Sequence, residues 1–367
     1  MCVWAVAGAA LTVAGCGGDP PADEGDATTS QVVTTGAATP TPGASGGMPT
    51  GDDADVSVDS TSGSSGAGSA LSSSSSDDDG TSTGENGSTD TGQTTGEALD
   101  CVNIPPLAVE YELVTGHVDS EDFVFDDAGN MVQIVFGDLL HSTYGMPPTL
   151  VFPGVGQSFS YGISILSTGE VAFAAATYVG LVGPGGSSDV LASGLSFANG
   201  VIIDQSDTIY TSEISAGRVL RIDPRTLAVE EVVSGIPGAN GIAFDQYFTK
   251  LYVSTLYGFI HEVDIATSAV EVVARDVGNP HGLVLDQCDN IYFTDPTALH
   301  RIRDGVIELM VDFAVDPGPA NSAVVSNMHF GSGVGGWEET SIYLMDRNNG
   351  NVLVFDIGIP GAPLPHL

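Results

Sequence analysis

The sequence predicts an all-β fold, a six-bladed β-propeller, preceded by a long segment without a core. Three observations lead to this prediction. A similar short sequence, in which a glycine precedes an apolar run, recurs at Gly162, Gly200, Gly241 and Gly282, at spacings of 38, 41 and 41 residues. Each repeat holds short apolar runs separated by turn residues, and four strands in about 40 residues are typical of a propeller blade. Residues 17–100, in contrast, are almost entirely small or polar.

The first 15 residues resemble a bacterial lipoprotein signal peptide. The apolar run ends in "VAGC", which is similar to a lipobox, so Cys16 is the expected lipidated first residue of the mature chain. The run is too short to span a bilayer as a helix. A buried N-terminal strand or helix is the alternative. We expect an exported protein that a lipid anchor holds to a membrane, in the periplasm or at the cell surface.

Residues 16–100 are expected to form a disordered linker, because so few large apolar side chains cannot offset the entropy of ordering the backbone. The formal net charge is −39, from 8 Lys and Arg against 47 Asp and Glu. The negative electrostatic field of such a chain opposes binding to nucleic acid, whose phosphates are also negative. A solvated acidic surface and cation binding are both compatible with it. Residues 101–367 are the expected propeller, and we expect a monomer.

The repeats give the blades in chain order. The first opens with "EDFVFDDAGNMVQIVF" and the second with "FSYGISILSTGEVAFAA". The third contains "GVIID", "TIYTSE", "RVLRID" and "AVEEVV", and the fourth contains "GIAFD", "KLYVST", "FIHEVD" and "VEVVA". The fifth contains "GLVLD", "NIYFTD", "LHRIR" and "VIELMV", and "SNMHFGSGVGGWEETSIYLMDR" opens the sixth. These runs alternate apolar and polar residues as strands do.

The sixth repeat lacks a fourth strand of its own. After "NVLVFDI" the chain continues as "GIPGAPLPHL", whose prolines disfavour a strand. The segment 107–116, "LAVEYELVTG", is similar to the fourth strand of the third repeat, "LAVEEVVSG". We therefore expect the N-terminal strand to complete the last blade, so that no long edge stays open.

Two cysteines occupy positions that this closure brings together. Cys101 precedes the closing strand, and Cys288 lies in the turn after the first strand of the fifth repeat. Both fall on the same face of neighbouring blades, and a disulfide is permitted in an exported protein. The alternative is a pair of unrelated thiols.

The residues just before each innermost strand are the candidate functional residues, because they converge on the central channel at one face. They are Glu121 or Asp122, Asn199, Asn240 and His281, with Tyr161, Asn327 and His329 as weaker candidates. A structural alternative exists for the asparagines, since Asn before Gly is common wherever a turn needs positive φ. Asp204, Asp245 and Asp286 follow the first strands and are expected to cap turns at the opposite face.

At these residues the chain resembles the senescence marker protein/gluconolactonase (regucalcin-like) family and, more loosely, the paraoxonases and the strictosidine synthase-like propellers. The resemblance covers residues 101–367 and implies a divalent metal at the channel mouth. By position, Glu121, Asn199 and Asn240 match three of the family's ligands, whereas His281 stands where the family has an Asp. "SEDF" also resembles a paraoxonase Glu-Asp pair, and Tyr161 stands where those enzymes have a catalytic His.

The resemblance implies a metal-dependent lactonase or esterase that acts on a small-molecule substrate. Carboxylate and amide oxygens suit Ca²⁺, which could polarise a lactone carbonyl and activate water. His281 could be the general base or a fourth ligand, which would favour Zn²⁺, and Mg²⁺ or Mn²⁺ are alternatives. Glu121 is the second catalytic candidate. The rival functions are a non-catalytic propeller that binds a small molecule or a partner protein, and a strictosidine synthase-like activity in which Glu121 acts as acid and base.

Overall fold

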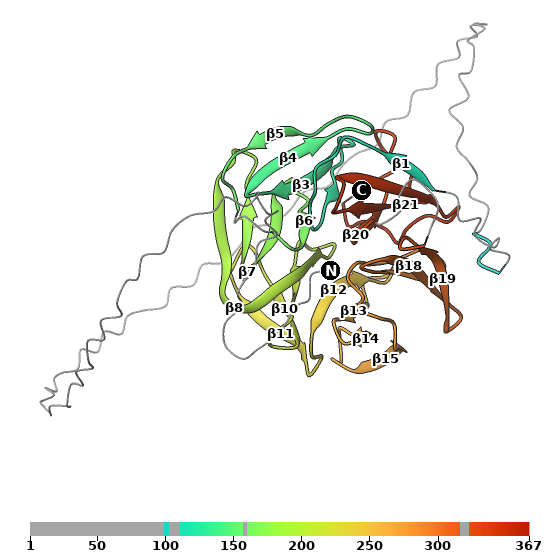
Figure 1. Cartoon of the computed structure of the whole chain (residues 1–367). Coiled ribbons are helices and arrows are strands. Elements are labelled where there is room, and N and C mark those ends of the chain that lie inside the picture. Colours follow the sequence, from blue (N-terminus) through green and yellow to red (C-terminus); the bar gives the residue numbers. More distant parts are fainter. Residues whose placement is uncertain (1–98, 103–110, 157–159, 316–322, 367) are drawn as a thin grey trace, which may run out of the picture. The chain divides into compact units, whose positions relative to one another are not determined.

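The fold consists of strands and turns arranged around a common centre. In the computed structural model the described residues are 99–102, 111–156, 160–315 and 323–366. They contain 22 strands and no helix, and they lie within one unit, Thr89–Leu367. Figure 1 shows the sheets as blades around a central axis. The prediction of an all-β propeller is confirmed, whereas the signal peptide, Cys16 and residues 16–98 of the linker lie outside the described residues.

Four of the sheets have four antiparallel strands, and the fifth has six. The four-stranded sheets are β2 (Val124–Phe125), β3 (Met131–Val135), β4 (Asp138–Ser142), β5 (Thr149–Phe152); β12 (Ala239–Phe244), β13 (Lys250–Thr255), β14 (Phe259–Asp264), β15 (Val270–Arg275); β16 (Leu283–Leu285), β17 (Ile291–Asp295), β18 (Ala298–Arg303), β19 (Val306–Asp312); and β1 (Glu112–Val114), β22 (Asn351–Asp356), β21 (Ser341–Asp346), β20 (Val325–Phe330). The six-stranded sheet is β11 (Val229–Ser234), β10 (Arg218–Ile222), β9 (Ile209–Glu213), β8 (Ser188–Ile203), β7 (Val171–Val182), β6 (Ile163–Ile165).

The number of blades differs from the prediction. The structure has five sheets and therefore five blades, not six. The second and third sequence repeats share the six-stranded sheet, because β8 is 16 residues long and continues from its pairing with β7 into its pairing with β9. It begins as the outer strand of one repeat and ends as the inner strand of the next, so the ladder does not stop between them. Repeat spacing counts sequence units and does not show that two units share a strand.

The ring closes as predicted, although residues 107–110 of the predicted closing strand lie outside the described residues. Strand β1 pairs antiparallel with β22, with Glu112 opposite Val354 and Val114 opposite Val352. The strand nearest the N-terminus thus becomes the outer strand of the sheet that ends the chain. Closure of this kind removes a long unpaired edge, which would otherwise be a template for aggregation.

A disulfide lies beside this closure and confirms the predicted pairing. Cys101 is bonded to Cys288, with the two Cα atoms 5.4 Å apart and 187 residues between them in sequence. Cys288 stands in the turn between β16 and β17, so the bond joins the start of the described chain to the fifth repeat. A crosslink over so long a loop restricts the unfolded chain.

The inner strands are buried and the outer strands are half exposed. All six residues of β12 and all but Lys250 of β13 are buried or nearly so, whereas β15 exposes most of its side chains. Between the first and last sheets the buried ring of Trp337 packs 4.8 Å from that of Phe125 and 5.1 Å from that of Tyr343, measured between centroids. The indole N–H of Trp337 also donates to the carbonyl oxygen of Gly129 at 3.0 Å, so this core joins the first and last sheets where their inner strands end.

After β22 the chain crosses the face at which the inner strands end. The backbone N–H of Gly361 donates to the carbonyl oxygen of Glu339, 3.0 Å away, and the N–H of Ala362 donates to that of Leu285, 2.8 Å away. The C-terminal segment thus contacts the fifth and sixth repeats through its backbone. The prediction that it is poor strand material is consistent with its one isolated bridge, between Gly361 and Asp286.

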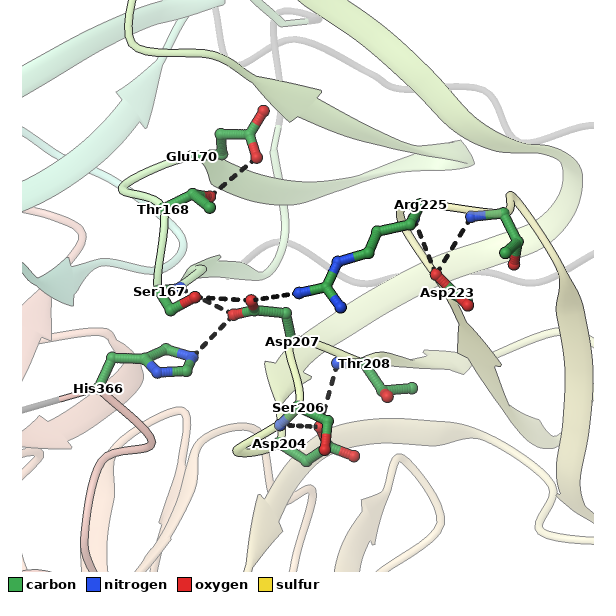
Figure 2. Close-up of polar contacts among 11 residues, drawn as sticks. Ser167, Thr168, Glu170, Asp204, Ser206, Asp207, Thr208, Asp223, Arg225 and His366 are labelled. Atoms are coloured by element: carbon green, nitrogen blue, oxygen red, sulfur yellow. Dashed lines mark hydrogen bonds and ion pairs between the residues drawn. The ribbon is translucent and has the colours of Figure 1, made fainter. Parts of the chain in front are cut away.

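The segment ends against the third repeat at Asp207. His366 Nε2 lies 2.9 Å from Asp207 Oδ1, and Ser167 donates through its backbone N–H and its hydroxyl at 2.8 and 2.6 Å. Figure 2 shows these groups and Arg225 converging on the one carboxylate. Burial alone would raise the pKa of Asp207, but the bonds from Ser167 and the charges of His366 and Arg225 bring it below its ordinary value. On the face where the inner strands end, Asp207 therefore joins the C-terminal segment to the second and third repeats.

Candidate functional site at the hub

A ring of close backbone contacts joins the repeats where their inner strands begin. A Cβ atom on Gly200 would lie 2.7 Å from the carbonyl oxygen of Asn240, and one on Gly241 would overlap the carbonyl oxygen of His281. The same holds for Gly162 against the carbonyl oxygen of Asn199, whereas a Cβ atom on Gly282 would lie 2.6 Å from the side-chain Oδ1 of Asn327 and 2.9 Å from its Cα. Each recurring glycine makes room for the equivalent residue of the next repeat. We call this ring the hub: Tyr161–Gly162, Asn199–Gly200, Asn240–Gly241, His281–Gly282 and Asn327.

The interpretation of the Asn-Gly pairs as turn signals is wrong. Asn199 and Asn240 lie inside β8 and β12, and neither they nor the glycines that follow them have positive φ. The glycine is required because another strand approaches its Cα closely, and not because the backbone turns there.

In three repeats, a hydroxyl group on the second strand forms hydrogen bonds to the backbone of two neighbouring repeats. Ser254 Oγ accepts from the backbone N–H of Gly241 at 2.9 Å and donates to the carbonyl oxygen of His281 at 3.0 Å. Ser212 bonds Gly200 and Asn240, and Thr294 bonds Gly282 and Ser326, in the same way. One buried hydroxyl thus satisfies two backbone groups of neighbouring repeats.

Glu121 and Arg347 form an ion pair at the hub. Arg347 Nη1 lies 2.7 Å from Glu121 Oε2, and the two side chains are 37% and 22% exposed. The carbonyl oxygen of Glu121 accepts from the N–H of Asn327 at 3.3 Å, which places Glu121 beside the ring. Burial raises the pKa of Glu121; Arg347 opposes this, and the charges of Asp122 and Asp119 add to it. A cation and a largely buried carboxylate therefore lie together at the predicted mouth of the central channel.

The sequence does not predict Arg347 as a site residue. It follows β21, and its backbone N–H donates to the carbonyl oxygen of Val324 at 2.8 Å. In an antiparallel meander the turn after the second strand lies on the same face as the start of the first. That rule, with only 8 Lys and Arg in the chain, is the signal that could have found it.

His281 is held at the hub as a neutral imidazole. Its backbone N–H donates to the carbonyl oxygen of Thr294 at 2.8 Å, and its Nε2 lies 3.4 Å from Asn279 Nδ2. Burial, and then the charge of Arg347, lower the pKa of His281 to about 4, against the opposing charge of Asp295. At neutral pH this ring can accept a proton.

Tyr161 shares this electrostatic neighbourhood. Burial raises the pKa of its hydroxyl, the charge of Glu121 raises it further, and Arg347 opposes them. Its ring lies 5.0 Å from that of Phe197, centroid to centroid. Arg347 contacts Glu121 directly, and its charge also acts on the pKa of Tyr161 and of His281.

The two asparagines differ in their surroundings. Asn240 is buried, and its Nδ2 donates to the carbonyl oxygen of Pro280 at 3.3 Å. Asn199 is half-buried, and its side chain makes no hydrogen bond within the described part of the chain. The hub ring places both backbones around the centre. The meeting of their side-chain oxygens with Glu121 around one ion stays a prediction.

Asp122 and His329 have structural partners instead. Asp122 Oδ2 accepts from the N–H of Ile163 at 3.0 Å, and Oδ1 lies 2.9 Å from His329 Nε2. The carboxylate thereby joins the first repeat to the second and the sixth, so Glu121 is the better hub candidate of the two acidic residues. Asn327 Oδ1 accepts from the N–H of Met328 at 3.0 Å.

The aspartates after the inner strands are turn caps, as predicted. Asp204 accepts from the backbone N–H groups of Ser206 and Thr208, Asp245 from those of Thr249 and Lys250, and Asp286 from those of Cys288 and Asn290. Carboxylates occupied in this way fix the turn and do not act at the hub.

The donor set as arranged does not fit a divalent ion. Its one carboxylate, Glu121, is already paired with the Arg347 guanidinium, whose charge would repel a metal at the same place. The charge of Arg347 also lowers the pKa of His281. Among the described residues no three His, Cys, Asp or Glu side chains are grouped as ligands. The metal stays a prediction from the resemblance, and the ion pair argues against it.

Comparisons with known proteins agree with the fold. No protein-family model matches the chain, and no curated protein matches its sequence. The chain is similar to the solved structure of a gluconolactonase from Xanthomonas campestris, at 14% identity and a TM-score of 0.55, covering 68% of this chain and 90% of that one. It is similar to a second structure, of a protein proposed to be a gluconolactonase, at 16% identity and a TM-score of 0.55, covering 69% and 94%.

A third similar structure is an auxiliary nutrient binding protein from Bacteroides thetaiotaomicron, at 13% identity and a TM-score of 0.52, covering 68% of this chain and 70% of that one. At such identities the likeness shows the fold alone. It supports the propeller fold, and the assignment to the gluconolactonase (regucalcin-like) family stays a prediction.

Proposed function

We propose that the hub is the active site of a lactone or ester hydrolase that acts on a small molecule. The observation that carries this proposal is the Glu121–Arg347 ion pair at the hub, to which the hub residue His281 adds a buried imidazole whose pKa burial and the charge of Arg347 lower to about 4. An acceptor for a proton, a cation and a carboxylate are the groups that hydrolysis of a carbonyl ester uses. The gluconolactonase-like fold supports the same class of reaction.

In this mechanism water adds to the carbonyl carbon of a lactone while the His281 imidazole takes one of its protons. The ring C–O bond then breaks, and the leaving oxygen receives that proton from the imidazolium. The product is a hydroxy acid, whose carboxyl group ionises. Glu121 would orient the substrate by accepting hydrogen bonds from its hydroxyl groups. The metal-dependent form, with an ion on Glu121, Asn199, Asn240 and His281, stays a prediction, and no step above uses an ion.

The test is hydrolysis of glucono-1,5-lactone by the full chain, with His281→Gln as the variant and His366→Gln, on the opposite face, as the matched control. We expect His281→Gln to lower kcat by about 100-fold or more and the control to behave as wild type. Because the pKa of His281 is lowered to about 4, the acid limb of the pH–rate profile should lie near pH 4. No turnover by wild type, or equal turnover by His281→Gln, would contradict the proposal.

Two observations favour other functions. A carboxylate already paired with an arginine suits a non-catalytic binding site, and the fold is shared by a nutrient binding protein. Burial raises the pKa of Glu121, which is what a proton-donating carboxyl in a strictosidine synthase-like reaction would need. Binding of a lactone without turnover would favour the first. Loss of condensation activity in Glu121→Gln would favour the second.

We also propose that the protein is exported and anchored to a membrane through Cys16. The Cys101–Cys288 disulfide supports an oxidising compartment. The test is fractionation of cells that express wild type or Cys16→Ala: we expect the wild-type chain with the membranes and the variant among soluble exported proteins. Equal distribution of the two would contradict the anchor.

A further inference from the structure

We propose that Arg347 is the ligand-binding cation of the hub, in the place that the family resemblance gives to a divalent metal, and that its ligand is an uncharged, oxygen-rich compound whose carbonyl oxygen accepts from the guanidinium. This inference rests on the proposed hydrolase function and deepens it, because it names the class of ligand and the group that polarises it.

The first support is the geometry of Arg347. Its backbone is fixed by the bond to Val324, and one end of its guanidinium, Nη1, is held 2.7 Å from Glu121 Oε2. Within the described part of the chain its side chain has no second ion-pair partner. A guanidinium carries several N–H donors on a planar fork. With 37% of the side chain exposed, the remaining donors are available to a ligand in the channel mouth.

The second support is the balance of charge around Arg347. Glu121 is paired with it. Burial raises the pKa of Asp119, the charge of Arg347 opposes this, and the charge of Asp346 adds to it. Asp346 is buried and accepts from Asn349 Nδ2 at 2.7 Å. An anionic ligand would meet these carboxylates, and a divalent cation would meet the guanidinium. An uncharged ligand avoids both penalties and can still accept a hydrogen bond from the arginine.

The third support is the chemistry of the group. An arginine keeps its charge at every working pH and donates in a fixed direction. When water adds to a carbonyl carbon, negative charge develops on the carbonyl oxygen, and a fixed cationic donor stabilises it. Glu121 holds the guanidinium in place and leaves its other donors free. Arg347 would thus polarise the carbonyl group of the lactone without a metal.

One arm of the test concerns metal. The melting temperature of the full chain, wild type and Glu121→Gln, is measured with a chelator and with millimolar Ca²⁺. We expect Ca²⁺ and the chelator to leave the wild-type melting temperature unchanged. A Ca²⁺-dependent rise in wild type that disappears in Glu121→Gln would show an ion on Glu121 and overturn the proposal.

The other arm measures ligand binding by calorimetry with and without a chelator. The probe is gluconolactam, an uncharged analogue that resists hydrolysis, compared with gluconate, which carries a carboxylate. We expect wild type to bind the lactam more tightly than gluconate and Arg347→Met to weaken lactam binding by about 10- to 100-fold. The matched control is Arg221→Met, since Arg221 pairs with Glu230 at 2.5 Å away from the hub; it should bind as wild type.

The two proposals fail in different ways. Equal lactam binding by wild type and Arg347→Met, tighter binding of gluconate, or binding abolished by the chelator overturns the role of Arg347, whatever the turnover. Lactam binding that depends on Arg347, with no turnover of the lactone, upholds the inference about the ligand and contradicts the hydrolase. Absence of lactam binding in wild type overturns the ligand class.

Discussion

The hydroxyl of Ser254 donates a hydrogen bond to the backbone carbonyl oxygen of His281, 3.0 Å away in the next sequence repeat. The same hydroxyl accepts from the N–H of Gly241 in its own repeat, at 2.9 Å. The backbone that carries the candidate base is therefore positioned by a neighbouring repeat. Stability of the fold and geometry of the hub depend on the same contacts.

The first prediction concerns Gly241. A methyl group there would overlap the carbonyl oxygen of His281, so Gly241→Ala should lower the free energy of unfolding by about 3 kcal/mol or more. Gly185→Ala is the matched control, because a Cβ atom at Gly185 meets no atom within 4 Å. Urea unfolding measures both. A loss for Gly241→Ala no larger than that for Gly185→Ala would refute the close contact.

The second prediction concerns the hydroxyl of Thr294, which accepts from Gly282 at 2.9 Å and donates to Ser326 at 2.7 Å. Thr294→Val keeps the shape and leaves two buried backbone groups unpaired, so it should cost about 2–4 kcal/mol. Thr294→Ser keeps the hydroxyl and removes one methyl, at a cost of about 1 kcal/mol. If the serine variant proves the less stable of the two in urea, the inter-repeat bond is not important.

The third prediction concerns the pH dependence of stability at His281. Its folded pKa, about 4, lies below its unfolded value, so between these pH values the unfolded chain binds a proton that the folded chain does not. The contribution of His281 is therefore complete above the unfolded pKa and falls as the pH drops toward 4. Between pH 7 and pH 5 wild type should lose more stability than His281→Gln. Equal losses would mean that the imidazole is not kept neutral by its surroundings.

The fourth prediction concerns the Cys101–Cys288 bond. Reduction should lower the stability of the folded chain by about 2–5 kcal/mol, because the unfolded chain regains the freedom of a long loop. The measurement is thermal unfolding with and without a thiol reductant. The double variant Cys101→Ser, Cys288→Ser should match the reduced protein and ignore the reductant; a melting temperature equal to that of the oxidised wild type would exclude a stabilising role.

Much of the fold follows from local pattern. The repeated phrases around Gly200, Gly241 and Gly282 predict strands where the structure has them, and the resemblance of 107–116 to 227–235 predicts the closing strand. The disulfide follows once that closure is assumed. The blade count does not, because the continuity of β8 depends on hydrogen bonds between repeats and not on either repeat alone.

The site is less predictable than the fold. The hub positions follow from the repeat, yet the asparagine-glycine pairs suggest turns, since a close approach by a distant strand leaves no local signal. Arg347 has no counterpart in the other repeats, so periodicity cannot reveal it. What gives Arg347 its role is the side chain of Glu121, more than 200 residues earlier in the chain.

The bond between Cys101 and Cys288 also decides how the domain bears force. Strand β1 is three residues long and lies at the outside of its sheet, where a pull along the chain would peel it off one hydrogen bond at a time. Tension applied to the chain before Cys101 instead passes through the sulfur atoms into the turn between β16 and β17. Mechanical load from the N-terminal side thus bypasses this short outer strand.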